Sequence, residues 1–163
     1  MKRQTLAVIA VLAVGLLLLA GTAEGKATRI SFTEEASCWT TSLGTGWTFR
    51  DGNLHIRGWT MECVEQVDLA GIPPLVGTRY EVINVNMDAT GSGRIWVSWR
   101  IEVEGGGWEG IANGTVTGML SEPSGTFRAV AHGTGIYEGQ QYFGEGVIID
   151  ASMSASTGYI LVP

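Results

Sequence analysis

The sequence predicts an all-β protein, an antiparallel meander closed into a barrel of approximately eight strands. Two observations predict this fold. Apolar and polar residues alternate with a period of two in segment after segment, while apolar residues at helical spacing are missing after residue 26. Glycine-rich turns also separate these segments at short intervals, and closing such a meander into a barrel removes its exposed edges.

The clearest strand is RIWVSWRIEVE, residues 94–104. Its odd-numbered positions from Ile95 to Val103 are apolar, so they share one face. The other face carries arginine, serine and glutamate, with Trp96 as the single exception. This pattern predicts a strand with one buried side.

The segment WTFRDGNLHI, residues 47–56, predicts a hairpin. Asp51-Gly52 suits a type I′ turn, which needs positive φ at both central positions. That turn pairs Phe49 with Leu54 and Trp47 with Ile56, so both apolar pairs fall on one face. We therefore expect Trp47 to belong to the core.

The remaining expected strands are 27–36, 79–89, 108–120, 125–132, 140–154 and 158–162, with turns at 90–93, 105–107, 121–125 and 156–158. The one longer connection is AGIPPLVG, residues 70–77, whose two prolines exclude a central strand.

The stretch GTGIYEGQQYFGEG, residues 133–146, raises the question of a phosphate-binding loop. A P-loop needs a lysine after its last glycine, and none is present here. The spacing G-x-G-x-x-x-G also differs from the dinucleotide fingerprint, and a strand rather than a helix follows. We interpret these glycines as turn and bulge positions. Gly110, Gly114 and Gly118 either let a barrel strand bend tightly or leave room for a large side chain or a ligand across the lumen.

Residues 1–25 have the layout of a secretory signal peptide. Lys2 and Arg3 precede a run of apolar residues from Leu6 to Ala20, which is shorter than the 18 or so residues that a membrane span needs. The small residues that follow place cleavage after Gly25 or after Ala23. We expect export to the periplasm or the extracellular space, one barrel domain over residues 26–163, and no stable membrane anchor after cleavage.

The charge of the chain excludes two classes of partner. The net charge is −6 for the full sequence, and Lys26 is the only lysine beyond the signal peptide. Nucleic-acid binding and attachment to anionic lipid both need clustered positive charge. Neither partner is expected, and the sequence leaves the oligomeric state open.

Cys38 and Cys63 are the only two cysteines. In an exported chain an isolated pair favours a disulfide over a metal site or a free thiol. Extending the register of the predicted hairpin puts Cys63 opposite residue 40, on the face that carries Cys38. This register is consistent with a disulfide.

The paired motifs GGGWEG (105–110) and GTGIYEG (133–139), in a chain of short strands, resemble the allene oxide cyclase-like barrel family, whose barrel the plant dirigent proteins share. The likeness covers the chain from about residue 79 onward. It implies an eight-stranded antiparallel barrel with a central cavity. Members of known activity steer the cyclisation or coupling of hydrophobic small molecules, but no catalytic residue of theirs can be matched here.

Catalytic residues stay unknown at this point. His55 and His132 are the only histidines, neither accompanies a nucleophile motif, and both are interpreted as surface or turn residues. Two distant histidines and a cysteine pair do not predict a metal site, and no cofactor is expected. The acidic pair Glu34-Glu35 is interpreted as solvated charge.

Four residues are candidates for ligand binding. Trp96 shares its strand face with Arg100. Trp59 comes two residues after Arg57, so in the predicted alternation these two also share a face. Each tryptophan therefore lies among polar groups, as it would in a pocket lining. Trp99, by contrast, is expected in the core.

Three functions remain open. The first is the binding of a small apolar molecule, or a passive role as an envelope or extracellular module. The second is a cyclase or isomerase that acts through a hydrophobic cavity, and the third is a secreted protein-interaction or inhibitor module. An enclosed cavity lined by Arg100, Glu102 and Trp96 would favour the first two. If that face lies outside and the lumen is filled with Ile, Val and Trp, an interaction or structural role is favoured. The enzyme also needs a buried charged pair within reach of the ligand, and a lumen packed solid with aliphatic side chains would exclude it.

Overall fold

The computed structural model describes residues 26–118 and 122–163, and the predicted signal peptide lies outside them. The described residues form nine strands and no helix: β1 (Thr28–Ser42), β2 (Gly46–Arg50), β3 (Asn53–Leu69), β4 (Leu75–Met87), β5 (Ser92–Val103), β6 (Gly106–Thr117), β7 (Ser124–Gly135), β8 (Gln141–Ile148) and β9 (Met153–Val162). Within this part of the chain, nothing forms a helix that could cross a membrane.

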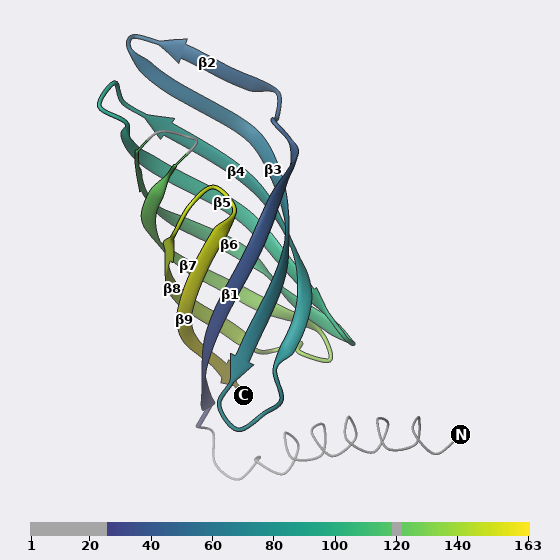
Figure 1. Cartoon of the computed structure of the whole chain (residues 1–163). Helices are drawn as coiled ribbons and strands as arrows, with labels where there is room; N and C mark the ends of the chain where they lie inside the picture. Colours follow the sequence, from purple (N-terminus) through teal and green to yellow (C-terminus); the bar gives the residue numbers. More distant parts are fainter. Residues whose placement is uncertain (1–25, 119–121) are drawn as a thin grey trace.

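The strands form a closed antiparallel barrel (Figure 1). Each strand from β3 to β9 pairs with the next, and β1 pairs with both β9 and β3. Eight strands therefore close the barrel, and β2 is an extra strand. The prediction of an all-β barrel of about eight strands is confirmed.

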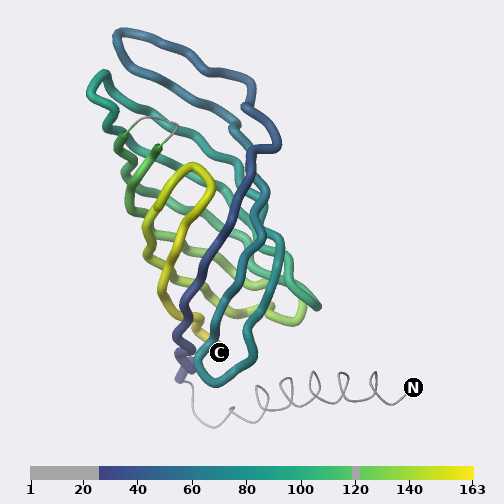
Figure 2. Tube along the Cα trace, in the orientation of Figure 1, coloured from purple at the N-terminus to yellow at the C-terminus, as the bar shows by residue number. Residues whose placement is uncertain are grey.

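β1 and β2 pair with different parts of the same long strand. β1 pairs with residues 60–69 of β3, while β2 pairs with residues 53–57. The hairpin of β2 and the start of β3 consequently runs past the end of β1, as the trace in Figure 2 shows.

The alternation predicted for β5 is confirmed. Ile95, Val97, Trp99 and Ile101 are buried in the lumen, and the residues between them are exposed. The same alternation on the other strands makes the barrel interior the one hydrophobic core of the described chain.

The turn at Asp51-Gly52 and its register are also confirmed. Both residues have positive φ, 52° and 78°, and Trp47 pairs with Ile56 as expected. The expectation that Trp47 is a core residue is wrong, since it is 42% exposed and Phe49 is 80% exposed. Both lie on the strand that extends past the barrel, where no opposite wall covers them.

The last hairpin differs from the prediction. The chain turns at residues 149–152, inside the segment expected to be one strand, and β9 runs without a break through the turn expected at 156–158. Asp150 explains the turn, because its Oδ1 accepts hydrogen bonds from the backbone N–H of Ser152 at 2.6 Å and from its hydroxyl at 2.8 Å.

The glycines at 133–139 belong to the hairpin between β7 and β8. Gly135 and Gly139 have φ of 65° and 85°, values that glycine adopts without steric cost. The stretch therefore contains a turn followed by a strand, as predicted. Gly144 and Gly146 lie within β8 in unbroken register with β7, so the expectation of a bulge at these two glycines is wrong.

Candidate functional site

A disulfide joins Cys38 on β1 to Cys63 on β3. The two residues are direct partners in the register of these strands. The extended hairpin register had placed residue 40 opposite Cys63. The chain leaves the sheet between Ser42 and Gly46, and the pairing of β1 with β3 shifts between Thr40 and Ser42, so the hairpin register does not continue to the cysteines. The predicted disulfide is therefore confirmed, but the predicted register that placed residue 40 opposite Cys63 is wrong.

A β-bulge on β3 decides which way Trp59 points. Ile56 pairs with Val85 and Trp59 pairs with Ile83, so β3 uses one residue more than β4 at this point. Gly58 has a φ of 67°, which is typical of the glycine in such a bulge. Because of the extra residue, Trp59 leaves the face of His55 and Arg57 and enters the lumen.

The barrel lumen holds a cavity of about 100 Å³. One water molecule needs roughly 10–15 Å³ of such volume, so the cavity is large enough for a small organic molecule. Most of its lining is apolar: Trp59, Met61, Ile83, Val85, Ile95, Val97, Trp99, Ala112, Val116, Phe127, Ala129 and Ile148. Its polar lining comes mainly from Glu34, Arg79, Glu81, Tyr142 and the β8–β9 turn.

Arg79 is the centre of this polar lining. Its Nη1 donates to Oε1 of Glu34 at 2.9 Å and to Oε1 of Glu65 at 3.3 Å. Its Nε lies 3.1 Å from Oε1 of Glu81 as an ion pair, without the alignment of a hydrogen bond. One guanidinium therefore faces three carboxyl groups.

Tyr142 extends the cluster, because its hydroxyl donates to Oε2 of Glu34 at 2.6 Å. The Tyr142 ring stacks on Phe32 with centroids 4.6 Å apart and meets Trp99 edge-on at 5.2 Å. These aromatic contacts fix the phenol at the boundary between the charged groups and the apolar wall.

Burial sets the protonation of this cluster. Desolvation raises the pKa of Glu65 well above its usual value, against the lowering effect of Arg79, and a hydrogen bond with Glu34 raises it further. Desolvation, followed by the charge of Glu34, likewise raises the pKa of Tyr142. Burial alone would lower the pKa of Arg79, but Glu81, Glu65 and Glu34 together raise it above its usual value. Burial thus favours the protonated form of Glu65, whereas the neighbouring carboxyl groups favour the charged form of Arg79.

The four predicted ligand-binding residues do not form one site. Trp59 lines the cavity. Trp96 and Arg100 lie on the outer face of β5, where Arg100 pairs with Glu102. Arg57 supports the bulge from outside, since its guanidinium donates to the carbonyl oxygens of Ile56 and Val85.

The interpretation of Glu34 as solvated charge is wrong, because it is only 5% exposed. Sequence reasoning also missed Arg79 and Glu81. A signal existed in RYEVINVNM, where Arg79 and Glu81 share a face with Ile83, Val85 and Met87. Charged residues at the start of an otherwise apolar face indicate a buried polar cluster.

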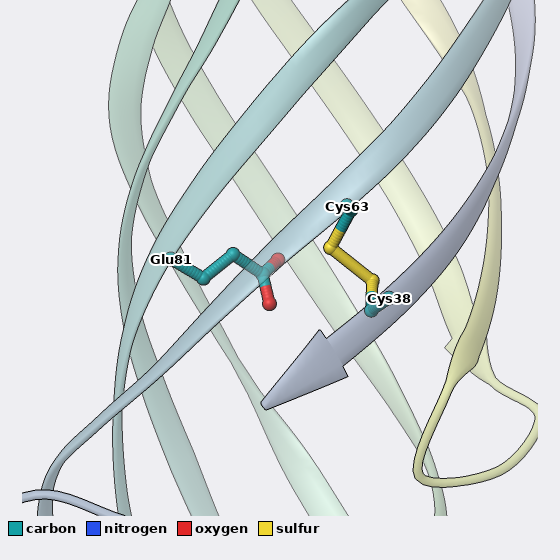
Figure 3. A group of neighbouring side chains, drawn as sticks. All are labelled: Cys38, Cys63 and Glu81. Atoms are coloured by element: carbon teal, nitrogen blue, oxygen red, sulfur yellow. A yellow bond between two sulfur atoms is a disulfide. The ribbon is translucent and has the colours of Figure 1, made fainter. Parts of the chain in front are cut away.

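Figure 3 shows Glu81 beside the disulfide. The sulfur atoms of Cys38 and Cys63 and a carboxylate oxygen of Glu81 all lie within 4.8 Å of one another. The sulfurs are bonded to each other, so they offer no thiolate to a metal. Of these three residues, only Glu81 offers the lumen a charged group, its carboxylate.

Two indole donors in the lumen have no protein partner. They are the Nε1 atoms of Trp99 and Trp108, both buried. Trp99 lines the cavity with its ring, but its Nε1 atom is itself buried and is not open to a ligand there.

Comparison with protein-family models, curated proteins and solved structures finds no match to this chain. The site is therefore interpreted from its own geometry.

Proposed function

We propose that this protein binds a small, largely apolar molecule inside the barrel. The observation that carries the proposal is the lumen cavity, whose walls are aliphatic and aromatic and whose polar groups gather around Arg79. Ligand sites have this composition, a mostly apolar surface with a few polar groups that fix orientation.

Trp96 and Arg100 lie on the outer face of β5. Their position would favour a protein-interaction module only if the lumen were filled with side chains. The lumen instead combines free volume with the buried ion pair of Arg79 and Glu34, in which the Nη1–Oε1 distance is 2.9 Å. This combination supports a small-molecule site over an interaction module.

Two adjacent residues of β6 allow a matched test. Ala112 is buried and lines the cavity, whereas Ile111 is exposed on the outer face. We expect Ala112→Phe to fill the cavity and to abolish binding of a neutral probe such as 2-phenylethanol, measured by isothermal titration calorimetry. Ile111→Phe should bind as the wild type does. Equal binding by both variants would place the ligand outside this cavity.

A second test needs no assumed ligand. Native mass spectrometry of protein purified from its own host should show a co-purifying ligand.

A second candidate function is isomerisation or cyclisation of the bound molecule, favoured by one observation. The carboxyl of Glu81 and the phenol of Tyr142, whose pKa is raised chiefly by burial, both line the cavity. A carboxylate base at this site could take a proton from one carbon of a ligand and return it to another, while the Tyr142 hydroxyl, which donates to Glu34, holds the charged groups in place.

This activity has a direct measurement. The protein should accelerate deuterium exchange at the α-carbons of a bound ketone in D₂O, followed by NMR, and Glu81→Gln should abolish the acceleration. Binding without any exchange would leave only the first function.

Export and family membership are part of the same proposal. The apolar run after Lys2 and Arg3 supports export, and the disulfide suits an oxidising compartment. The closed barrel with a cavity supports membership of the allene oxide cyclase-like group. Mass spectrometry of the exported protein should find an N-terminus at Lys26 or Glu24, and an intact Met1 would contradict cleavage.

A further inference from the structure

The cavity carries an excess of negative charge, which bears on the class of ligand that the proposed function requires. Among its lining residues that the structure describes, Arg79 is the one cation, against the carboxyl groups of Glu34, Glu81 and Asp150. Glu65 adds a further carboxyl to the Arg79 cluster from just behind the wall. The balance stays negative whether or not Glu65 is protonated.

The Nη donors of Arg79 are already used, and its Nε, which has no hydrogen-bond partner, is buried against Glu81. Nη1 contacts Glu34 and Glu65, Nη2 donates to the hydroxyl of Ser154 at 3.1 Å, and Nε faces Glu81. A ligand carboxylate would therefore find no accessible guanidinium donor and would be repelled by the surrounding carboxylates.

Glu81 has the free acceptor capacity. Its side chain is 15% exposed, more than that of Glu34 or Glu65 at 5% and 1%. Glu34 already accepts from Arg79 and Tyr142, whereas Glu81 contacts Arg79 through Oε1 alone. In the strand register Glu81 lies between Met61 and Trp99, so its carboxylate adjoins the apolar wall.

The aromatic residues of the wall suit a cation as well. Trp59 and Trp99 both line the cavity, and an indole face attracts an ammonium group electrostatically.

We propose that the ligand is an apolar amine, bound with its protonated nitrogen on the carboxylate of Glu81 and its carbon skeleton against Trp59, Trp99 and the aliphatic wall. This inference depends on the proposed function, because it specifies the ligand of the same cavity. It excludes fatty acids and other apolar carboxylates as ligands.

Three probes with one skeleton test the charge directly. They are 2-phenylethylamine, 2-phenylethanol and phenylacetate, titrated into the mature exported protein at pH 7 by isothermal titration calorimetry. We expect the amine to bind about tenfold more tightly than the alcohol, as a charge-assisted hydrogen bond provides, and phenylacetate to bind most weakly.

Glu81→Gln removes the charge while it keeps the size of the side chain. This variant should bind the amine and the alcohol about equally, with the alcohol affinity unchanged from the wild type. Glu102→Gln is the matched control, since Glu102 is an exposed glutamate paired with Arg100 on the outer face, and it should leave all three affinities unchanged. Circular dichroism checks the fold, and the order of the three probes on the wild type tests the inference even if Glu81→Gln does not fold.

The outcomes separate the two proposals. Binding of the alcohol with no preference for the amine, or tightest binding of phenylacetate, would overturn the amine inference and leave the apolar cavity function standing. Failure of all three probes to bind would overturn both.

Discussion

Arg79 Nη1 lies 2.9 Å from Oε1 of Glu34, although the two residues are 45 positions apart and their strands do not pair with each other. The contact connects β4 to β1 through the lumen, behind β3. Because both side chains are buried, neither charge is compensated by water. The barrel core therefore depends on this one arginine to neutralise its carboxyl groups.

Arg79→Met should be strongly destabilising. It leaves buried carboxyl groups without a cation, and breaking a buried pair in this way costs about 3–5 kcal/mol. The unpaired carboxyls would take up protons more readily in the folded state, so lowering the pH should restore part of the loss. Urea unfolding of the variant at pH 7 and pH 5 measures both effects.

The matched control is Arg100→Met, which breaks an exposed pair with Glu102. We expect a loss of about 1 kcal/mol or less, because solvent screens surface pairs. Equal losses of unfolding free energy in the two variants would show that the buried cluster around Arg79 contributes no more to stability than an exposed ion pair does.

Glu65 predicts a specific pH dependence. Burial raises its pKa in the folded state above the usual value near 4.5. The folded protein therefore holds a proton that the unfolded chain releases, and stability falls as the pH rises from about 4.5 toward the folded pKa, by up to about 1.4 kcal/mol per pH unit. Glu65→Gln imitates the neutral acid, so its free energy of unfolding should decline less between pH 5 and pH 8. Parallel curves for the variant and the wild type would show that Glu65 is ionised in the folded protein.

Much of the barrel could be predicted from local patterns. The alternation in residues 94–104 and the Asp51-Gly52 turn depend on neighbouring residues, and both are found as expected. The exposure of Trp47 could not be predicted, because it depends on where β1 ends and the barrel wall stops covering β2.

The candidate site was harder to predict, for two physical reasons. A bulge reverses the side-chain alternation, so Trp59 changes face although its spacing from Arg57 suggests otherwise. The charged cluster also unites residues from strands that do not pair, such as Glu34 and Arg79. Such a contact has no signature in the spacing of either segment.

The disulfide should supply a measurable share of the stability. Its cysteines are 25 residues apart, and closing a loop of this length stabilises a fold by about 3 kcal/mol. We expect the double variant Cys38→Ala/Cys63→Ala to lose about this amount in urea unfolding. Dithiothreitol should destabilise the wild type similarly and leave the double variant unchanged. Native protein that reacts with a thiol reagent before unfolding would contradict the bond.

The bulge at Gly58 should control both stability and the ligand site. Its φ of 67° is unfavourable for any residue with a Cβ, so Gly58→Ala should cost about 1 kcal/mol or relax the bulge. Relaxation would turn Trp59 out of the lumen and weaken binding of 2-phenylethanol several-fold. Gly46→Ala is the control, because a Cβ there meets nothing within 4 Å and Gly46 has no positive φ. Unfolding curves and calorimetric titrations of both variants test the point, and unchanged affinity and stability in Gly58→Ala would show that the bulge does not position Trp59.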